Sequence, residues 1–308
     1  MDIHAISALF GISAKDAVRL EKGHINQTFL VTSLNGKKYV LQSLNREVFH
    51  CPEAVMLNTS QIESALVDEE IVRVPNFLRH DGKNCAEWGG STWRMYPYAE
   101  SEKCDDIPCI IGFSYGRFMR SINAVPLKLS PAIEDFHNYS AYVEKLKAAV
   151  PSGDIPDILV KLGNELDEIF ADVPKRNIHG DAKADNIIIG KPCTVIDLDT
   201  AMNGYAALDY GDMVRSAGTG DTEALTRGFA EGLDGMLTDR EVQSLYYGVL
   251  WCTGELAVRY LTDVYAEKRY FTGKNREQSR ERSVSLLKQL RKFILMKPDF
   301  ERIMEKSF

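Results

Sequence analysis

The sequence His179-Gly180-Asp181-Ala182-Lys183-Ala184-Asp185-Asn186 is followed, nine residues on, by Val195-Ile196-Asp197-Leu198-Asp199-Thr200. The first segment places an Asn five positions after an Asp, and the second places an Asp at the end of an apolar run. The apolar residues between the two segments surround Gly190-Lys191-Pro192, a pattern that predicts a hairpin. This hairpin would fold the chain back and bring Asn186 close to Asp197.

This order of an Asp, an Asn and a second Asp resembles the catalytic core of protein kinases, where all three side chains serve phosphoryl transfer. The reaction requires positioning and charge neutralisation rather than a covalent intermediate. We expect Asp181 to orient the acceptor hydroxyl and to accept its proton. Magnesium prefers oxygen ligands, so we expect Asn186 and Asp197 to hold Mg²⁺ beside ATP. Taken singly, each residue could instead cap a turn or a helix, but their order in the chain favours catalysis.

The composition is ordinary for a globular protein, with 44% hydrophobic and 26% charged residues. The 37 Lys and Arg residues against 44 Asp and Glu residues give a net charge of −7, which argues against a general nucleic-acid or anionic-membrane binder. We expect no membrane span and no secretory leader, because the chain starts without a basic and apolar signal. The six cysteines include no Cys-x-x-Cys pair, so we expect reduced thiols and a cytoplasmic location.

The N-terminal part predicts a small lobe that contains a sheet. Residues 29–33 and 38–42 flank Asn35-Gly36, which is a strong signal for a hairpin turn. Residues 52–65 have helical spacing with a proline in the first turn. Residues 93–98 are typical of a strand that runs into a connection.

A polar run at residues 99–106 marks a change in composition and separates the two lobes that we expect. Residues 1–98 would form a nucleotide-binding lobe, and residues 99–308 a catalytic and substrate-binding lobe. Because the second lobe is expected to be mainly helical, the fold class is α+β, with a protein-kinase-like bilobal fold. Helix-like spacing of apolar residues occurs at 110–122, 139–150, 155–170, 211–218, 223–232, 239–265 and 276–303, the last of these broken at Lys297-Pro298.

A polar loop that contains Gly23, Asn26 and Thr28 precedes the predicted hairpin. In a kinase-like lobe such a loop covers the ATP phosphates through backbone N–H groups, although a plain turn is an equally good interpretation. Protein kinases place a lysine on the following strand, where this chain has Gln42. We expect Gln42 to hydrogen-bond a phosphate and backbone groups near Tyr96 to face the adenine. The candidates for a cation at the phosphates are Lys38, Arg46 and Lys183.

The chain contains neither the P-loop motif Gly-x-x-x-x-Gly-Lys-Ser/Thr nor a Gly-x-Gly-x-x-Gly motif. Its His-Gly-Asp-x-x-x-x-Asn and Ile-Asp-x-Asp motifs instead resemble the aminoglycoside phosphotransferase and choline kinase superfamily. Members have a protein-kinase-like bilobal fold and phosphorylate hydroxyls on small molecules. Within this superfamily the chain is most similar to the N-acetylhexosamine 1-kinases, which place the ATP γ-phosphate on the anomeric hydroxyl of GlcNAc or GalNAc. The segments that carry this similarity are 23–29 (GHINQTF), 39–45 (YVLQSLN), 196–200 (IDLDT), 209–215 (DYGDMVR) and 255–263 (ELAVRYLTD).

The resemblance implies that the sugar contacts Asp181, Thr200, Arg259 and Tyr270. Thr200 could instead cap a helix or a turn. Arg259 could instead pair with Glu255, four positions earlier on the same helix face.

Three neighbours of these motifs are expected to be structural. Asp209 and Asp212 would cap a helix or brace the catalytic loop by accepting backbone hydrogen bonds. His179 would pack within the loop rather than act as an acid or a base.

Two other functions stay open. The chain could phosphorylate choline, an amino alcohol or an aminoglycoside, for which an acidic or aromatic-lined pocket would be expected in place of one that uses Arg259. It could also be a catalytically inactive nucleotide-binding protein, a hypothesis whose only support is the missing strand lysine. The expected partners are therefore ATP, Mg²⁺ and a small-molecule substrate, with no nucleic acid and no membrane. The sequence does not indicate an oligomeric state.

Overall fold

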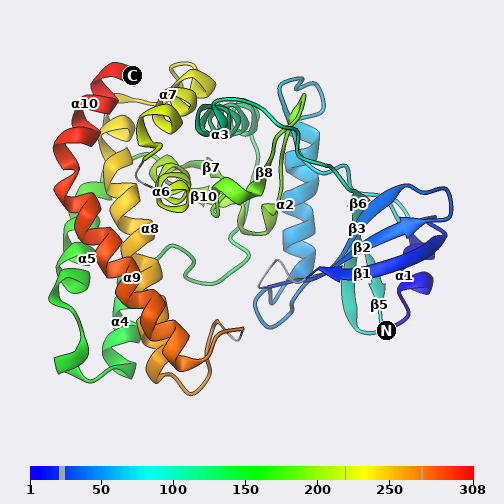
Figure 1. Ribbon diagram of the computed structural model, residues 1–308, viewed down its shortest axis with the longest axis horizontal. Coiled ribbons are helices and arrows are strands. Elements are labelled where there is room, and N and C mark those ends of the chain that lie inside the picture. Colours follow the sequence, from blue (N-terminus) through cyan, green and yellow to red (C-terminus); the bar gives the residue numbers. More distant parts are fainter. Residues whose placement is uncertain (21–24, 219, 272) are drawn as a thin grey trace.

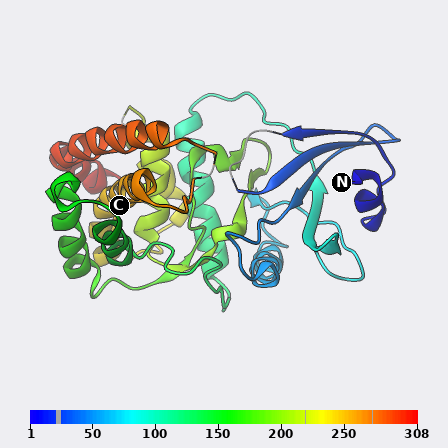
Figure 2. The same cartoon turned by 90° about the horizontal axis from the view of Figure 1, so that it is seen from below.

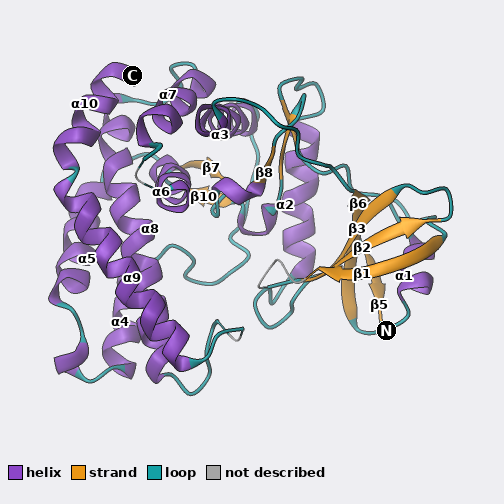
Figure 3. Cartoon of the chain, viewed as in Figure 1, coloured by secondary structure: helices purple, strands orange, loops and turns teal. Residues whose placement is uncertain are grey.

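Strands gather in the N-terminal part of the chain and helices in the C-terminal part (Figures 1 and 3). The computed structural model describes residues 1–20, 25–218, 220–271 and 273–308. A five-stranded sheet dominates the smaller part, and the larger part is mainly helical. The view in Figure 2, turned by 90°, shows the same division. The prediction of an α+β, protein-kinase-like bilobal fold is thus confirmed.

The predicted hairpin around Asn35-Gly36 forms the centre of the sheet. Thr32 lies opposite Lys38 at its end, and Gly36 takes a φ of 80°, which costs glycine little. The N-terminal helix α1 (Ile3–Leu9) contributes Ile6 to the small core beneath the sheet. In spatial order the antiparallel strands are β1 (Ala14–Leu20), β2 (Gln27–Ser33), β3 (Lys38–Ser43), β6 (Ser91–Pro97) and β5 (Ala86–Trp88).

Helix α2 (Pro52–Ala65) follows β3 and begins, as predicted, with a proline in its first turn. Its Asn58 is only 2% exposed. The Asn58 amide donates hydrogen bonds to the Ser130 carbonyl at 2.7 Å and to the Ala201 carbonyl at 3.0 Å. Because Ala201 belongs to the C-terminal part, this buried amide joins α2 to the segment that carries the second Asp motif.

The larger part is built from the predicted helices, and the largest difference in a boundary is at the start of one helix. One helix begins at Ala206 instead of residue 211, because Gly211 lies inside the helix and does not mark its start. A Cβ at Gly211 would approach the Gly248 carbonyl oxygen to 2.2 Å, so glycine permits close helix packing there. The helices are α3 (Ile107–Asn123), α4 (Tyr139–Ala149), α5 (Asp157–Phe170), α6 (Ala206–Ala217), α7 (Thr222–Leu233), α8 (Asp239–Tyr265), α9 (Arg276–Leu295) and α10 (Lys297–Ser307).

The predicted break at Lys297-Pro298 is confirmed, since this proline lies in the first turn of α10. Within the described ranges, no helix is both long and apolar enough to cross a lipid bilayer.

Short strands hold the motif segments in the larger part. The hairpin predicted around Gly190-Lys191-Pro192 is confirmed as an antiparallel pair, and a strand from the smaller part joins it in parallel. A second antiparallel pair flanks the catalytic segments. The hairpin pairs β8 (Ile187–Ile188) with β9 (Cys193–Val195), which also pairs with β4 (Val72–Arg73), and the second pair joins β7 (Arg176–Ile178) to β10 (Met202–Gly204).

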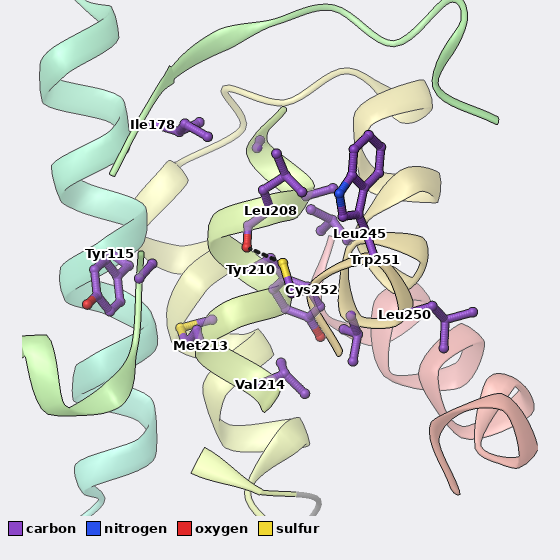
Figure 4. Close-up of a cluster of buried hydrophobic side chains, with 14 of the residues drawn as sticks. Tyr115, Ile178, Leu208, Tyr210, Met213, Val214, Leu245, Leu250, Trp251 and Cys252 are labelled. Carbon is purple, nitrogen blue, oxygen red and sulfur yellow. Dashed lines mark hydrogen bonds between the residues drawn. The ribbon is translucent and has the colours of Figure 1, made fainter. Parts of the chain in front are cut away.

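The core of the larger part packs α6 between α3 and α8 (Figure 4). Tyr115 on α3, Met213 on α6 and Leu245 on α8 are at most 1% exposed. The Cys252 thiol donates to the Leu208 carbonyl at 3.3 Å, so α8 also bonds α6 directly. Burial of such side chains is worth about 25 cal/mol per Å² of apolar surface, and it fixes the helix that braces the catalytic loop.

Helices α3 and α7 approach so closely that only glycine fits at their contact. A Cβ at Gly116 would lie 2.3 Å from the Phe229 carbonyl oxygen, and a Cβ at Gly232 would lie 2.3 Å from the Phe113 carbonyl oxygen. The opposing atoms are backbone, which cannot move aside without shifting a helix.

We expect Gly116→Ala to lower the free energy of unfolding by about 3 kcal/mol, because forced overpacking against backbone outweighs the gain of about 1 kcal/mol from alanine's helix propensity. Urea denaturation measures the change. The matched control is Gly153→Ala, where a Cβ would meet nothing within 4 Å. Equal stability of Gly116→Ala and the wild-type protein would contradict the packing described.

Candidate active site

The β8-β9 hairpin brings the predicted Asp, Asn and Asp residues together. The Ile196 amide donates to the Asn186 carbonyl at 2.9 Å, so the chain before β8 lies beside the chain after β9. Asn186 ends the short 3-10 helix η2 (Ala184–Asn186), and its Nδ2 donates to the Asp181 carbonyl at 2.9 Å. The predicted approach of Asn186 to the segment that carries Asp197 is confirmed, and Asp181 adjoins it.

Residues 179–186, the candidate catalytic loop, are held by hydrogen bonds to α6. Both carboxylate oxygens of Asp209 accept backbone hydrogen bonds, one from the His179 amide and one from the Gly180 amide, each at 2.8 Å. The His179 ring is fully buried; its Nε2 donates to the Ile196 carbonyl, and its Nδ1 accepts from the Asp181 amide. The structural roles predicted for Asp209 and His179 are confirmed.

Asp212, one turn further along α6, does not brace the loop in this way. Its Oδ1 accepts two hydrogen bonds from the Arg215 guanidinium, at 2.9 and 2.7 Å, and both side chains are buried. Although burial would raise the pKa of Asp212, this guanidinium holds it below its ordinary value. Asp212 is structural, as expected, but as half of an ion pair.

Lys183 lies at the carboxylate of Asp181. Its Nζ is 2.7 Å from Asp181 Oδ2, and the Asp181 side chain is 25% exposed. Burial alone would lower the pKa of Lys183, but the Asp181 carboxylate outweighs it and raises that pKa. The Tyr115 hydroxyl donates to the Lys183 carbonyl at 2.7 Å and fixes the backbone there. The cation is therefore held beside a carboxylate that is partly open to solvent.

Asp197 adopts a left-handed backbone conformation, with φ 63° and ψ 52°, just before the 3-10 helix η3 (Leu198–Thr200). Asp tolerates this conformation better than most residues. Asp197 is an exposed residue, although much of the protein lies around its carboxylate. The resulting loss of hydration, together with the carboxylates of Asp199 and Asp181, raises the pKa of Asp197 to about 6. Such a carboxylate favours a bound cation.

Asn186 and Asp197 fit a magnesium ion that is completed by substrate and water. In the part of the chain that the structure describes, no group of three or more His, Cys, Asp or Glu side chains could hold a metal by itself. Magnesium keeps several waters and takes phosphate oxygens, so one carboxylate and one amide oxygen suffice. The Asn186 amide nitrogen donates to the Asp181 carbonyl, so its Oδ1 would be the atom that holds a metal ion.

The predicted nucleotide residues belong to a network that reaches the second Asp motif. The Gln42 amide donates to the Thr28 hydroxyl at 3.2 Å, and Arg94 Nε donates to the Gln42 carbonyl at 3.0 Å. The Arg94 guanidinium also bonds both carboxylate oxygens of Asp199, and Asn26 Nδ2 donates to Asp199 at 2.6 Å. These contacts are within the protein, and the nucleotide contacts of Asn26, Thr28 and Gln42 stay predictions.

The other two predicted nucleotide residues are Gly23 and Tyr96. Gly23 lies outside the described residues. The Tyr96 ring packs edge-on against Phe77, with ring centroids 5.1 Å apart. The candidate phosphate cations Lys38 and Arg46 pair with Glu100 and Glu87 at the surface.

Arg94, a buried cation of this region, was not predicted from the sequence. The residue stands within the predicted strand 93–98, but nothing local indicates that β6 pairs with β3. That pairing places Arg94 directly opposite Gln42. Gln42 stands at the strand position where protein kinases have their lysine.

Arg259 fills a box of aromatic rings. Its Nη1 lies 3.5 Å from Glu255 Oε1, and its side chain is 11% exposed, so the predicted alternative of a helix ion pair is confirmed. Its sugar contact stays a prediction. The rings within 6 Å of its guanidinium carbon are Tyr270 at 4.4 Å, Tyr142 at 5.2 Å, Phe271 at 5.5 Å and Phe136 at 5.7 Å.

Thr200 has a structural partner as well. Its hydroxyl donates to the His179 carbonyl at 3.2 Å, and the residue is buried. This bond agrees with the alternative role in a turn and ties η3 to the catalytic loop. Contact of Thr200 with a sugar stays a prediction.

His137 links Glu255 on α8 to the catalytic loop. Nothing in the sequence indicated this role. Its Nδ1 lies 3.1 Å from Glu255 Oε2, and its Nε2 lies 2.8 Å from the Gly180 carbonyl. Both partners only accept hydrogen bonds, so both ring nitrogens carry protons and the ring is an imidazolium. Burial would lower the pKa of His137, but Glu255, Asp212 and the Gly180 carbonyl outweigh burial and raise it to about 9.

This imidazolium predicts a loss of stability at alkaline pH. The unfolded histidine loses its proton near pH 6.5 and the folded one near pH 9, so the stabilisation is complete below 6.5 and disappears as the pH rises through 9. We expect the wild-type protein to lose on the order of 2 kcal/mol over this interval. Thermal unfolding between pH 6 and pH 10 measures the loss.

The control is His137→Gln, which keeps a polar group but cannot titrate. We expect it to be less stable than the wild-type protein at pH 7 and to lack the component centred between pH 6.5 and 9. Parallel stability curves for the two proteins would contradict the buried ion pair.

The fold is similar to those of several solved structures. Solved structures with similar folds include a choline/ethanolamine kinase family protein from Mesorhizobium loti, with a TM-score of 0.67 and 15% identity over 94% of this chain and 91% of that chain. Amicoumacin kinase in complex with AMP-PNP, Ca²⁺ and Ami has a TM-score of 0.66 and 13% identity over 94% and 88%. The GDP complex of a wild-type aminoglycoside 2'-phosphotransferase has a TM-score of 0.63 and 16% identity over 99% and 98%.

At these identities the solved structures show the fold alone. The family itself follows from a sequence model described as the phosphotransferase enzyme family, which matches residues 16–243. This match covers well over half of the chain and includes Asp181, Asn186 and Asp197. The chain therefore belongs to the phosphotransferase enzyme family.

Proposed function

We propose that this phosphotransferase moves the γ-phosphate of ATP to the anomeric hydroxyl of an N-acetylhexosamine, GlcNAc or GalNAc, or of a related hexose. In this proposal residues 1–98 bind the nucleotide and residues 99–308 supply the catalytic and acceptor residues. The dependence on ATP makes the cytoplasm the proposed location.

The catalytic roles rest on the group formed by Asp181, Asn186 and Asp197. Asn186 and Asp197 would hold Mg²⁺, which when bound supplies positive charge to the phosphates. Asp181 would orient the acceptor hydroxyl and take its proton as the new oxygen–phosphorus bond forms. Lys183, 2.7 Å from Asp181, would compensate the negative charge that arrives with the phosphates. Because an anomeric hydroxyl is more acidic than an ordinary alcohol, a carboxylate is a sufficient base.

The observation that carries the choice of acceptor is the occupied aromatic box around Arg259. A quaternary or protonated amine would be recognised by such rings or by free carboxylates. Here the rings already surround the protein's own cation, and Glu255 is paired with both Arg259 and His137. A further positive charge would be repelled, whereas a neutral sugar could accept hydrogen bonds from the guanidinium. The geometry therefore favours a neutral, oxygen-rich acceptor over choline, ethanolamine or an aminoglycoside.

We expect transfer from Mg·ATP to GlcNAc or GalNAc, and we expect Asp181→Asn to lower kcat by about 10³-fold, because the proton acceptor is lost. The assay follows ADP release with GlcNAc, GalNAc, galactose, glucose, choline, ethanolamine and kanamycin, with GTP as a second donor. NMR of the product locates the phosphate. Turnover of the amines alone would replace the sugar proposal with the amine kinase, and binding of Mg·ATP without any turnover would support the inactive nucleotide-binding protein.

We expect Arg259→Met to raise the KM for the sugar at least tenfold, since a hydrogen-bond donor to the acceptor is removed, while the KM for ATP stays the same. Initial-rate kinetics with each substrate varied in turn measure both constants. The matched control is Arg280→Met, an exposed arginine over the Tyr265 ring at 5.9 Å. A normal sugar KM in Arg259→Met would remove this residue from the acceptor site.

A further inference from the structure

Three polar side chains line up across the N-terminal sheet. Thr28 on β2 lies directly opposite Gln42 on β3, and Gln42 lies directly opposite Arg94 on β6. Directly opposite residues of neighbouring strands point to the same face of a sheet. Hydrogen bonds of 3.2 and 3.0 Å join the row, from Gln42 to Thr28 and from Arg94 to Gln42. The row ends in a guanidinium that reaches Asp199 in the C-terminal part.

Both side chains of the Arg94–Asp199 ion pair are buried. The two side chains are 2% and 3% exposed, and the guanidinium contacts both carboxylate oxygens. Asn26 supplies a third donor to Asp199, and the Phe77 ring lies 5.6 Å from the guanidinium carbon. A buried ion pair is stable only when its geometry is good and its other polar atoms are bonded. Both conditions hold here, so loss of either partner would leave an uncompensated charge inside the protein.

The position of Asp199 gives this pair its role. Asp199 stands two residues after Asp197 in η3, and the next residue, Thr200, is bonded to the His179 carbonyl. Arg94 therefore holds, from the sheet, the turn that presents Asp197. It also neutralises Asp199, so that phosphates arriving at the site meet fewer unpaired carboxylates.

The residue at position 42 is explained by the same pair. A lysine there, as in protein kinases, would place a second cation against the Arg94 guanidinium. Glutamine instead offers its carbonyl to Arg94 Nε and its amide to Thr28. Gln42 and Arg94 thus belong together. Compared with protein kinases, the cation stands on β6 instead of the neighbouring strand β3.

We propose that Arg94 replaces the strand lysine of protein kinases as a positioning residue. Paired with Asp199, it docks the sheet on the catalytic segment and leaves Asp197 as the carboxylate for the metal. It acts through Asp199 and not by direct contact with the phosphates. This inference rests on the proposed use of a magnesium nucleotide, but it does not depend on the identity of the acceptor.

A double-mutant cycle with Mg·AMP-PNP as the probe tests the role of Arg94. Isothermal titration calorimetry measures affinity for the wild-type protein, Arg94→Gln, Asp199→Asn and the double variant. We expect Arg94→Gln to bind at least tenfold more weakly, because the unpaired Asp199 carboxylate then lies beside the phosphates and the metal. The double variant removes both charges, and we expect it to recover affinity to within about threefold of wild type. Arg94→Lys, which keeps the charge, should weaken binding less than Arg94→Gln.

The matched control is an arginine–carboxylate pair outside the Arg94 network, in which Glu241 is buried and Arg176 is 27% exposed. Arg176 donates to both oxygens of Glu241, at 2.7 and 2.9 Å. Arg176→Gln and Glu241→Gln should lower the melting temperature without changing the affinity for Mg·AMP-PNP. Equal losses of affinity in both cycles would show that loss of another arginine–carboxylate pair has the same effect and would overturn a specific role for Arg94.

The remaining outcomes separate this inference from the proposed function. If the double variant binds as weakly as Arg94→Gln, then Arg94 serves the phosphates directly or Asp199 serves the metal, and the positioning role is overturned while nucleotide use stands. If the wild-type protein binds no Mg·AMP-PNP, the proposed nucleotide-dependent function fails, and the role of Arg94 fails with it.

Discussion

The close approach of three carboxylates is the constraint on which the rest of the site depends. Burial, together with the carboxylates of Asp199 and Asp181, raises the pKa of Asp197 to about 6. Two of the three are compensated by protein cations, Lys183 at Asp181 and Arg94 at Asp199. The third, Asp197, stays open to solvent and is the one that a metal ion would neutralise. In the proposed site, this leaves one carboxylate to be neutralised by a bound cation.

Buried polar contacts hold this charge cluster from both parts of the molecule. From the sheet, Arg94 fixes the turn after Asp197. In the larger part, Asp209 on α6 accepts hydrogen bonds from two backbone amides of the catalytic loop. His137 Nε2 bonds the Gly180 carbonyl. His137 also reaches Glu255, and through it the guanidinium of Arg259. Arg259, Glu255 and His137 thus form a row of charged side chains that ends at the Gly180 carbonyl, one residue before Asp181.

The sequence predicted the features that arise from local patterns. Each of three local signals determines a short piece of backbone: the Asn35-Gly36 turn, the proline at the start of α2 and the apolar runs around Gly190. The hairpin at Gly190 in turn predicted that Asn186 lies near Asp197. Arg94 and His137 could not be found in this way. Arg94 depends on the pairing of β3 with β6, which are separated by a helix and more than forty residues. His137 has a left-handed φ of 56° in an irregular segment, and its partners lie far away in the chain. The start of α6 was misplaced because Gly211 serves helix packing and not a helix boundary.

A crystal structure with AMP-PNP and Mn²⁺ would test this account most directly, because the anomalous signal of manganese locates the metal without reference to the protein. The account predicts a metal ion on oxygens of Asn186 and Asp197, with Asp199 still paired to Arg94. A metal ion bound by Asp199, with the Arg94 guanidinium turned to the phosphates, would contradict it.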